Sequence, residues 1–149
     1  MHAPPRWFVH AFWHAHRWVV RVSRGRVGLW RAGSKRWGTL RLTTTGRYSG
    51  RPRDVLLGYF EDADHLVTLA MNGWGAPEPA WWLNLQARPE AVALTRDGLV
   101  RVHARAAEGA ERDRLWSRWA EIDDRLDEYA ALRPRPTAVV VLEPRAPGV

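Results

Sequence analysis

Six short segments between residues 39 and 142 have the residue pattern of β-strands, and the way they are connected restricts the fold more than any other feature. Thr39–Thr45 alternates and is rich in β-branched side chains, which is typical of a strand. Asp97-Gly98 separates two such segments and strongly favours a tight hairpin. The segments do not alternate regularly with helices. We therefore expect an α+β fold with a mainly antiparallel sheet that curls into a barrel, rather than a doubly wound parallel sheet.

The expected elements follow from periodicity and from turn residues. The strands are predicted at Thr39–Thr45, Asp54–Phe60, His65–Met71, Ala91–Thr95, Leu99–Ala106 and Thr137–Leu142. A short helix should begin near Pro79 and end before Pro89. A longer amphipathic helix is predicted over Glu108–Ala131, because its apolar residues recur at intervals of four, three and four. The chain of 149 residues is long enough for one domain.

Charge divides the chain into two parts. Residues 1–53 contain 12 Lys and Arg and no acidic residue, whereas residues 54–149 contain 11 basic and 16 acidic residues. The first third of the chain therefore favours an anionic partner, such as a phosphate, a polyanionic cofactor, nucleic acid or an acidic lipid. The absence of cysteine excludes disulfides, thiolate nucleophiles and iron–sulfur clusters. We expect a cytoplasmic protein.

The segment Trp7–Val22 is predicted to be an amphipathic helix, with residues 1–38 forming this helix and a basic connector before the barrel domain at 39–149. A polar stripe that includes His10 and His14 runs along it, and the segment is too short and too charged to span a bilayer. No third ligand accompanies these histidines, so no metal is expected. The helix suits either a peripheral contact of residues 7–22 with a membrane, or packing over the ligand pocket with His16 turned inward. We favour packing.

Two segments have the residues of a ligand site. The turn GRYSGRPR (Gly46–Arg53) combines three arginines, a hydroxyl group and two glycines, which suits the binding of a phosphate. The segment Met71–Asn84 offers a glycine- and proline-rich loop, three tryptophans and a carboxamide. Trp81 and Asn84 are spaced three residues apart on the predicted helix and could face a planar ring together. Burial of Trp81 or Trp82 in the core would explain the same pattern.

These segments resemble the deazaflavin-dependent nitroreductase family. The resemblance covers Thr39–Pro144 and consists of LTTTGRYSGRPRDVLLGYF, then AMNG with PAWWLNLQARPE, then AAEGAERDRLW and VVVLEP, in that order. It implies a split β-barrel of about six strands with flanking helices. It also implies binding of the deazaflavin coenzyme F420, with transfer of hydride from its reduced form to a quinone, a nitroaromatic or a similar activated acceptor. The coenzyme has a phosphate and a γ-glutamyl tail, which suits the basic first third of the chain.

The family pattern assigns a role to each part of the site. The turn would hold the phosphate, the strand backbone would lie along the linker, the segment around Met71 would lie against the ring, and the helix would complete the pocket. The cofactor-binding residues expected on this basis are Arg47, Tyr48, Ser49, Arg53, Asp54, Val55, Leu56, Leu57, Gly58, Leu69, Ala70, Met71, Asn72, Ala80, Trp81, Trp82, Leu83 and Asn84. Tyr129 is the one candidate for a catalytic proton donor.

The sequence departs from the family at three points. Tyr48 replaces a usual lysine, Met71 replaces a frequent serine, and Tyr129 is the one tyrosine retained before the last strand. These departures leave a non-catalytic F420 carrier as an alternative function. A basic nucleic-acid-binding module is a weaker alternative, because no groove-reading motif is present, and no nucleic acid is expected as a partner. FMN is the alternative cofactor, and the protein is expected to be a monomer or a homodimer.

Overall fold

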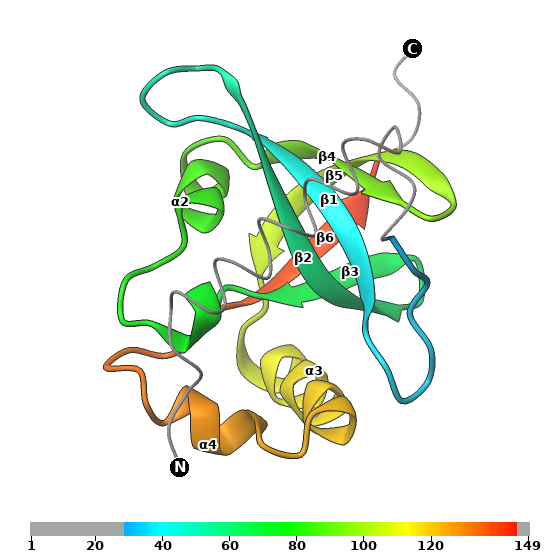
Figure 1. Ribbon diagram of the computed structural model, residues 1–149, viewed down its shortest axis with the longest axis vertical. Coiled ribbons are helices and arrows are strands. Elements are labelled where there is room, and N and C mark those ends of the chain that lie inside the picture. The colour runs from blue at the N-terminus through cyan, green and yellow to red at the C-terminus, as the bar shows by residue number, and fades with distance from the viewer. Residues whose placement is uncertain (1–28, 146–149) are drawn as a thin grey trace.

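The computed structural model describes residues 29–145, and in this part six strands form a closed antiparallel barrel (Figure 1). Around the barrel the strands follow the order β1-β2-β3-β6-β5-β4, and β4 closes against β1. The strands are β1 (Gly38–Thr45), β2 (Pro52–Asp62), β3 (His65–Leu69), β4 (Glu90–Thr95), β5 (Gly98–Ala106) and β6 (Val139–Pro144). The expected antiparallel barrel is therefore confirmed. The predicted helix Trp7–Val22, with His10, His14 and His16, lies outside the described residues.

Local turn chemistry explains the hairpins. β4 and β5 are paired from Thr95 and Gly98 outward, and Gly98 has a φ of 122°, a conformation that glycine adopts without a steric penalty. The Asp97 backbone N–H donates to the Thr95 hydroxyl and closes the turn. The predicted hairpin at Asp97-Gly98 is thus present. β2 extends beyond its predicted ends at both termini and pairs with all eight residues of β1.

Three α-helices and one 3₁₀ turn complete the described chain: η1 (Asn72–Trp74), α2 (Ala80–Ala87), α3 (Gly109–Ile122) and α4 (Leu126–Ala130). The predicted single helix Glu108–Ala131 is wrong, because it is broken at Asp123. Asp123 has an extended backbone, and its carboxylate accepts a hydrogen bond from the Arg125 N–H. An aspartate side chain that bonds to nearby backbone competes with helix continuation, which accounts for the break.

The two larger apolar cores lie on opposite faces of the strands. Residues that point into the barrel, among them Leu40, Leu42 and Leu57, form the inner core. Residues of β3 and β6 that point outward, such as Val67 and Val141, pack with Leu115 and Trp119 of α3 as an outer core. In Figure 1, α3 and α4 lie together at one end of the barrel and α2 lies beside it. Leu115 and Trp119 therefore attach α3 to the outer face of the barrel.

Ion pairs fix α3 to the barrel at the edge of the outer core. Arg114 donates two hydrogen bonds to Asp62 of β2, at 2.8 and 3.0 Å. Arg105 of β5 donates two to Glu111 of α3, at 2.5 and 2.9 Å. These hydrogen bonds are the main reason that the pKa values of Asp62 and Glu111 are lowered.

Acid is expected to weaken the attachment of α3. A carboxyl group whose pKa is lower in the folded than in the unfolded protein stabilises the fold above its unfolded pKa of about 4, and this stabilisation is lost as the pH falls through the folded value. Denaturant midpoints measured between pH 7 and pH 2.5 should therefore fall, and Asp62→Asn or Glu111→Gln should flatten the decline. Glu121→Gln, an exposed site on the same helix, is the control. Equal slopes in all variants would contradict the assignment.

Within residues 29–145, none of the helices has the length and apolar character needed to cross a bilayer.

Candidate functional site

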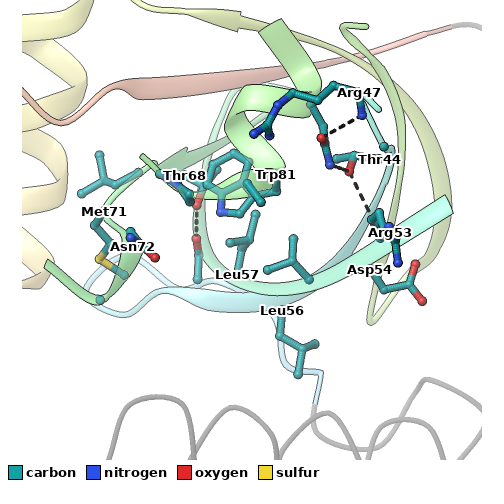
Figure 2. A pocket seen from close by; sticks show the side chains of 18 of the residues that line it. Thr44, Arg47, Arg53, Asp54, Leu56, Leu57, Thr68, Met71, Asn72 and Trp81 are labelled. Atoms are coloured by element: carbon teal, nitrogen blue, oxygen red, sulfur yellow. Dashed lines mark hydrogen bonds between the residues drawn. The ribbon is translucent and has the colours of Figure 1, made fainter. Parts of the chain in front are cut away.

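A cavity of about 570 Å³ opens between the β1–β2 turn, strand β2, η1 and α2. Figure 2 shows Arg47 and Arg53 at one end of it and Met71 and Asn72 at the other, with Leu57 and Trp81 between them. The cavity therefore has a cationic end and an apolar end.

The cationic end is built from the turn between β1 and β2. Arg53 is paired with Thr44 across the two strands, so both side chains lie on the barrel-facing side. The Arg47 guanidinium lies over the exposed Tyr48 ring, 4.5 Å from its centre. Within the described residues, neither Arg47 nor Arg53 forms an ion pair with a carboxylate. Two guanidiniums that lack an internal counter-charge and face one cavity are suited to bind an anion.

The glycines of this turn are required by its geometry. A Cβ atom on Gly46 would lie 2.6 Å from the Ser49 hydroxyl oxygen, and Gly50 has a φ of 70°. The Ser49 oxygen accepts a hydrogen bond from the Arg51 N–H, so its own proton is available to a ligand. Arg51 itself does not line the cavity.

Asn84 connects the helix α2 to the β1 side of the turn. It is buried, its side-chain oxygen accepts a hydrogen bond from the Arg47 N–H at 3.1 Å, and its nitrogen donates to the Thr44 hydroxyl at 3.1 Å (Figure 2). The Thr44 hydroxyl in turn makes a long contact of 3.5 Å with the Arg53 carbonyl oxygen. The carboxamide therefore holds the backbone at Arg47 directly and reaches the Arg53 carbonyl only through the Thr44 hydroxyl.

The apolar end is formed by β2, the end of β3, η1 and Trp81. Val55 and Leu57 lie on the barrel-facing side of β2. Leu56 also lines the cavity, although its side chain points away from it (Figure 2). The Thr68 hydroxyl donates to the Gly58 carbonyl oxygen at 2.7 Å and is thereby fixed at the wall. Apolar walls with a few fixed polar atoms are typical of sites for small molecules and cofactors.

The loop after β3 has an unusual backbone. Asn72, Gly73 and Trp74 have φ values of 50°, 60° and 64°, so three consecutive residues are left-handed. Such conformations are costly for residues other than glycine and persist where the surrounding structure enforces them, often at ligand sites. Met71, Asn72 and Gly73 all line the cavity.

Most residues predicted for the cofactor site meet at this cavity. All of the predicted cofactor-binding residues line the cavity except Ala70, Trp82 and Leu83. Ala70 and Trp82 are buried in the inner core, and Trp82 contacts the edge of Trp81. Trp81 is buried and also lines the cavity, so the core interpretation is confirmed for it and its contact with a ligand stays a prediction.

Tyr129 does not line the cavity. Its ring is stacked on Trp74 with centroids 6.1 Å apart, behind the loop that forms the apolar wall. Its role as a proton donor stays a prediction.

The predicted cofactor-binding residues did not include five residues that line the cavity, namely Thr44, Gly46, Thr68, Gly73 and Pro79. Gly46, Gly73 and Pro79 lie in the two segments chosen as candidate sites. Thr44 and Thr68 lie outside those segments and had a detectable signal. Thr44 and Thr68 are polar residues at barrel-facing positions of strands whose other barrel-facing residues are apolar, such as Leu42 and Leu66. A polar residue that interrupts a core-facing alternation is a candidate site residue.

Replacing Asn84 with alanine is expected to destabilise the protein by about 1–3 kcal/mol, since it leaves the buried Thr44 hydroxyl without this donor and the Arg47 N–H without its acceptor. Urea denaturation measures the loss. Gln86→Ala, an exposed site on the same helix, should change stability by less than about 0.5 kcal/mol. If both substitutions have the same effect, Asn84 does not anchor the turn.

A closed antiparallel barrel with this cavity defines the protein as a split β-barrel. The chain belongs to the family described as F420H(2)-dependent quinone reductase, whose pattern it matches over residues 13–144. The resemblance inferred from the sequence motifs is thereby confirmed.

Solved structures with the same fold agree. An F420-H2 dependent reductase (FDR-A) is 29% identical, with a TM-score of 0.64 over 70% of this chain and 93% of that chain. A structure described as a domain-swapped dimer is 25% identical, with a TM-score of 0.66 over 89% of this chain and 98% of that chain. A putative pyridoxamine 5'-phosphate oxidase from Listeria innocua is 16% identical, with a TM-score of 0.53 over 72% and 84%, and shows the fold alone.

Proposed function

We propose that the protein is a reductase that transfers hydride from reduced F420 to a quinone, with nitroaromatic compounds as alternative acceptors. The observation that carries this proposal is the polarity of the cavity. Among the described residues, Arg47 and Arg53 have no carboxylate partner at one end of the cavity, and an apolar wall ends at Met71 and Asn72. Membership of the F420H(2)-dependent quinone reductase family supports the choice of cofactor and acceptor.

The residues present fit this cofactor. Arg47, Arg53 and the Ser49 hydroxyl would bind its phosphate, and the ring would lie between Leu57, Trp81 and the η1 loop. When bound, reduced deazaflavin supplies the hydride. The protein's own contribution is to orient the ring, to exclude water with the apolar wall, and to neutralise the anionic end. The Thr68 hydroxyl, whose proton is used by Gly58, offers a fixed hydrogen-bond acceptor at the cavity wall.

Oxidation of reduced F420 in the presence of menadione tests this function. The absorbance of oxidised F420 should rise with multiple turnovers per protein molecule. A carrier would bind F420 in a fluorescence titration and show no turnover with menadione or with a nitroaromatic acceptor. That result would reject the reductase and retain the binding site.

F420 should bind at least about tenfold more tightly than FMN, because one additional charge-assisted hydrogen bond contributes roughly 1.5–3 kcal/mol. Arg88 lies beside the turn, outside the cavity, and its Nη1 is 4.0 Å from the position of a Cβ on Gly50. A long anionic tail could reach this cation, whereas a single phosphate could not. Fluorescence titration of both cofactors measures the ratio. Equal affinities would contradict the preference for F420.

A further inference from the structure

Arg133, in the connection between α4 and β6, has a completely buried side chain, and each of its five N–H groups has an acceptor. Nε donates to the Gly75 carbonyl at 2.9 Å. Nη1 donates to the Ala70 carbonyl at 3.1 Å and to the Thr137 hydroxyl at 2.7 Å. Nη2 donates to the Pro77 carbonyl at 3.4 Å and to the Glu78 carboxylate at 2.8 Å.

Four of these five acceptors belong to one loop, the connection between β3 and α2. The same loop contains the three consecutive left-handed residues and supplies Met71, Asn72 and Gly73 to the apolar end of the cavity. A hydrogen bond from the Asn72 side chain to the Pro77 carbonyl crosses the loop internally, at 2.8 Å. The Trp74–Tyr129 stack joins the loop to α4.

A buried guanidinium is expensive to desolvate, and a fully paired one is strongly disruptive when its partners are removed. The inner and outer cores are apolar, so their packing does not require the charge of the Arg133 guanidinium. The five acceptors match the five donors of a guanidinium, whereas a lysine ammonium has only three donors. The charge therefore serves the conformation of the loop.

We propose that Arg133 is a positioning residue that clamps the β3–α2 loop in its left-handed conformation and thereby fixes the cavity wall at Met71, Asn72 and Gly73. Arg133 does not line the cavity. The effect of Arg133 on catalysis rests on the proposed reductase function. Arg133 fixes the position of the ring and the acceptor, whereas the arginine turn at the other end of the cavity determines the affinity for F420.

Hydrogen–deuterium exchange of the cofactor-free protein tests the clamp independently of any activity. In Arg133→Lys, the amides of Trp74 and Gly75, which are bonded within the loop, should exchange at least about tenfold faster. Amides of β1 and β6 should keep their protection. Glu78→Gln, which weakens one contact of the clamp, should show the same pattern to a smaller degree. Arg135→Lys, an exposed site two residues away, should change nothing.

Steady-state kinetics with reduced F420 and menadione then test the positioning. Arg133→Lys should lower kcat by roughly 10- to 100-fold, because small misplacements of reacting groups have effects of this size. The dissociation constant for F420 should stay within about threefold, since the distant turn is unchanged. The activity of Arg135→Lys should match that of the original protein.

Three results would overturn the proposal. Unchanged exchange in the loop would show that Arg133 does not clamp it. Faster exchange throughout the barrel would make Arg133 a general stabilising residue. A looser loop with unaltered kcat would remove the link to catalysis. If the unsubstituted protein does not oxidise reduced F420, the proposed function fails, and the exchange experiment still decides whether the clamp exists.

Discussion

Substituting Arg53 with alanine is expected to raise the dissociation constant for F420 by about 10- to 150-fold, which corresponds to roughly 1.5–3 kcal/mol for one charge-assisted hydrogen bond. Arg53 lines the cationic end of the cavity beside Arg47, and neither has a carboxylate partner among the described residues. The guanidinium is therefore free to pair with the phosphate. Arg47→Ala should have an effect of the same size. Fluorescence titration at constant ionic strength measures both.

Arg51→Ala is the matched control, because Arg51 belongs to the same turn and does not line the cavity. Its effect should be clearly smaller. Tyr48 is 89% exposed at the cavity rim, so Tyr48→Lys should maintain or improve affinity by adding a cation there. Affinity should also fall as salt increases, since long-range attraction is screened. Equal, small losses at all three arginines would show a general basic surface instead of a phosphate site.

The barrel could be predicted from sequence because its determinants are local. The alternation of β1 and the Asp97-Gly98 turn each require only neighbouring residues to be interpreted. No local sequence signal predicts the pairing of β1 with β4, which closes the barrel. Closure is nevertheless expected, because it removes the exposed edge strands of a twisted antiparallel sheet.

The broken helix shows where periodicity misleads. Leu115, Trp119, Ile122 and Leu126 keep helical spacing across the break, so the pattern predicts one continuous helix. Trp119 and Leu126 do share the outer core, but they reach it from two separate helices. The helix breaks at Asp123, whose carboxylate accepts a hydrogen bond from the Arg125 backbone. The spacing of apolar residues does not indicate this hydrogen bond.

The candidate site also has a part that could be predicted from sequence and a part that could not. Arg47, Ser49 and Arg53 lie in one contiguous turn, so their residue types and spacing point to an anion site directly. The role of Arg133 could not be predicted, because its loop acceptors lie 55 to 63 residues earlier in the chain. Only the folded topology places β3 beside β6 and brings the two connections together.

Trp119→Ala should have the largest effect on stability, a loss of about 3–5 kcal/mol. The indole is 3% exposed, stacks on Trp37 with centroids 6.2 Å apart, and contacts the Phe60 ring at 5.4 Å. Removing it leaves a cavity between α3 and the barrel that the rigid strands cannot fill. Because small domains are stable by about 5–15 kcal/mol in total, the denaturant midpoint should fall steeply. Trp116→Ala, a half-buried site on the same helix, should lose clearly less.

Adding F420 to the Trp119→Ala variant tests whether the outer core and the ligand site are energetically independent. A ligand that binds the folded state stabilises it by about 2.7 kcal/mol at a concentration of one hundred times its dissociation constant. Trp119 lies on the opposite side of β2 from the cavity-facing Leu57, so F420 should restore stability to the variant by the same increment as in the original protein. A much smaller increment would show that the packing of α3 shapes the cavity through β2 and β3, and that the two cores are not independent.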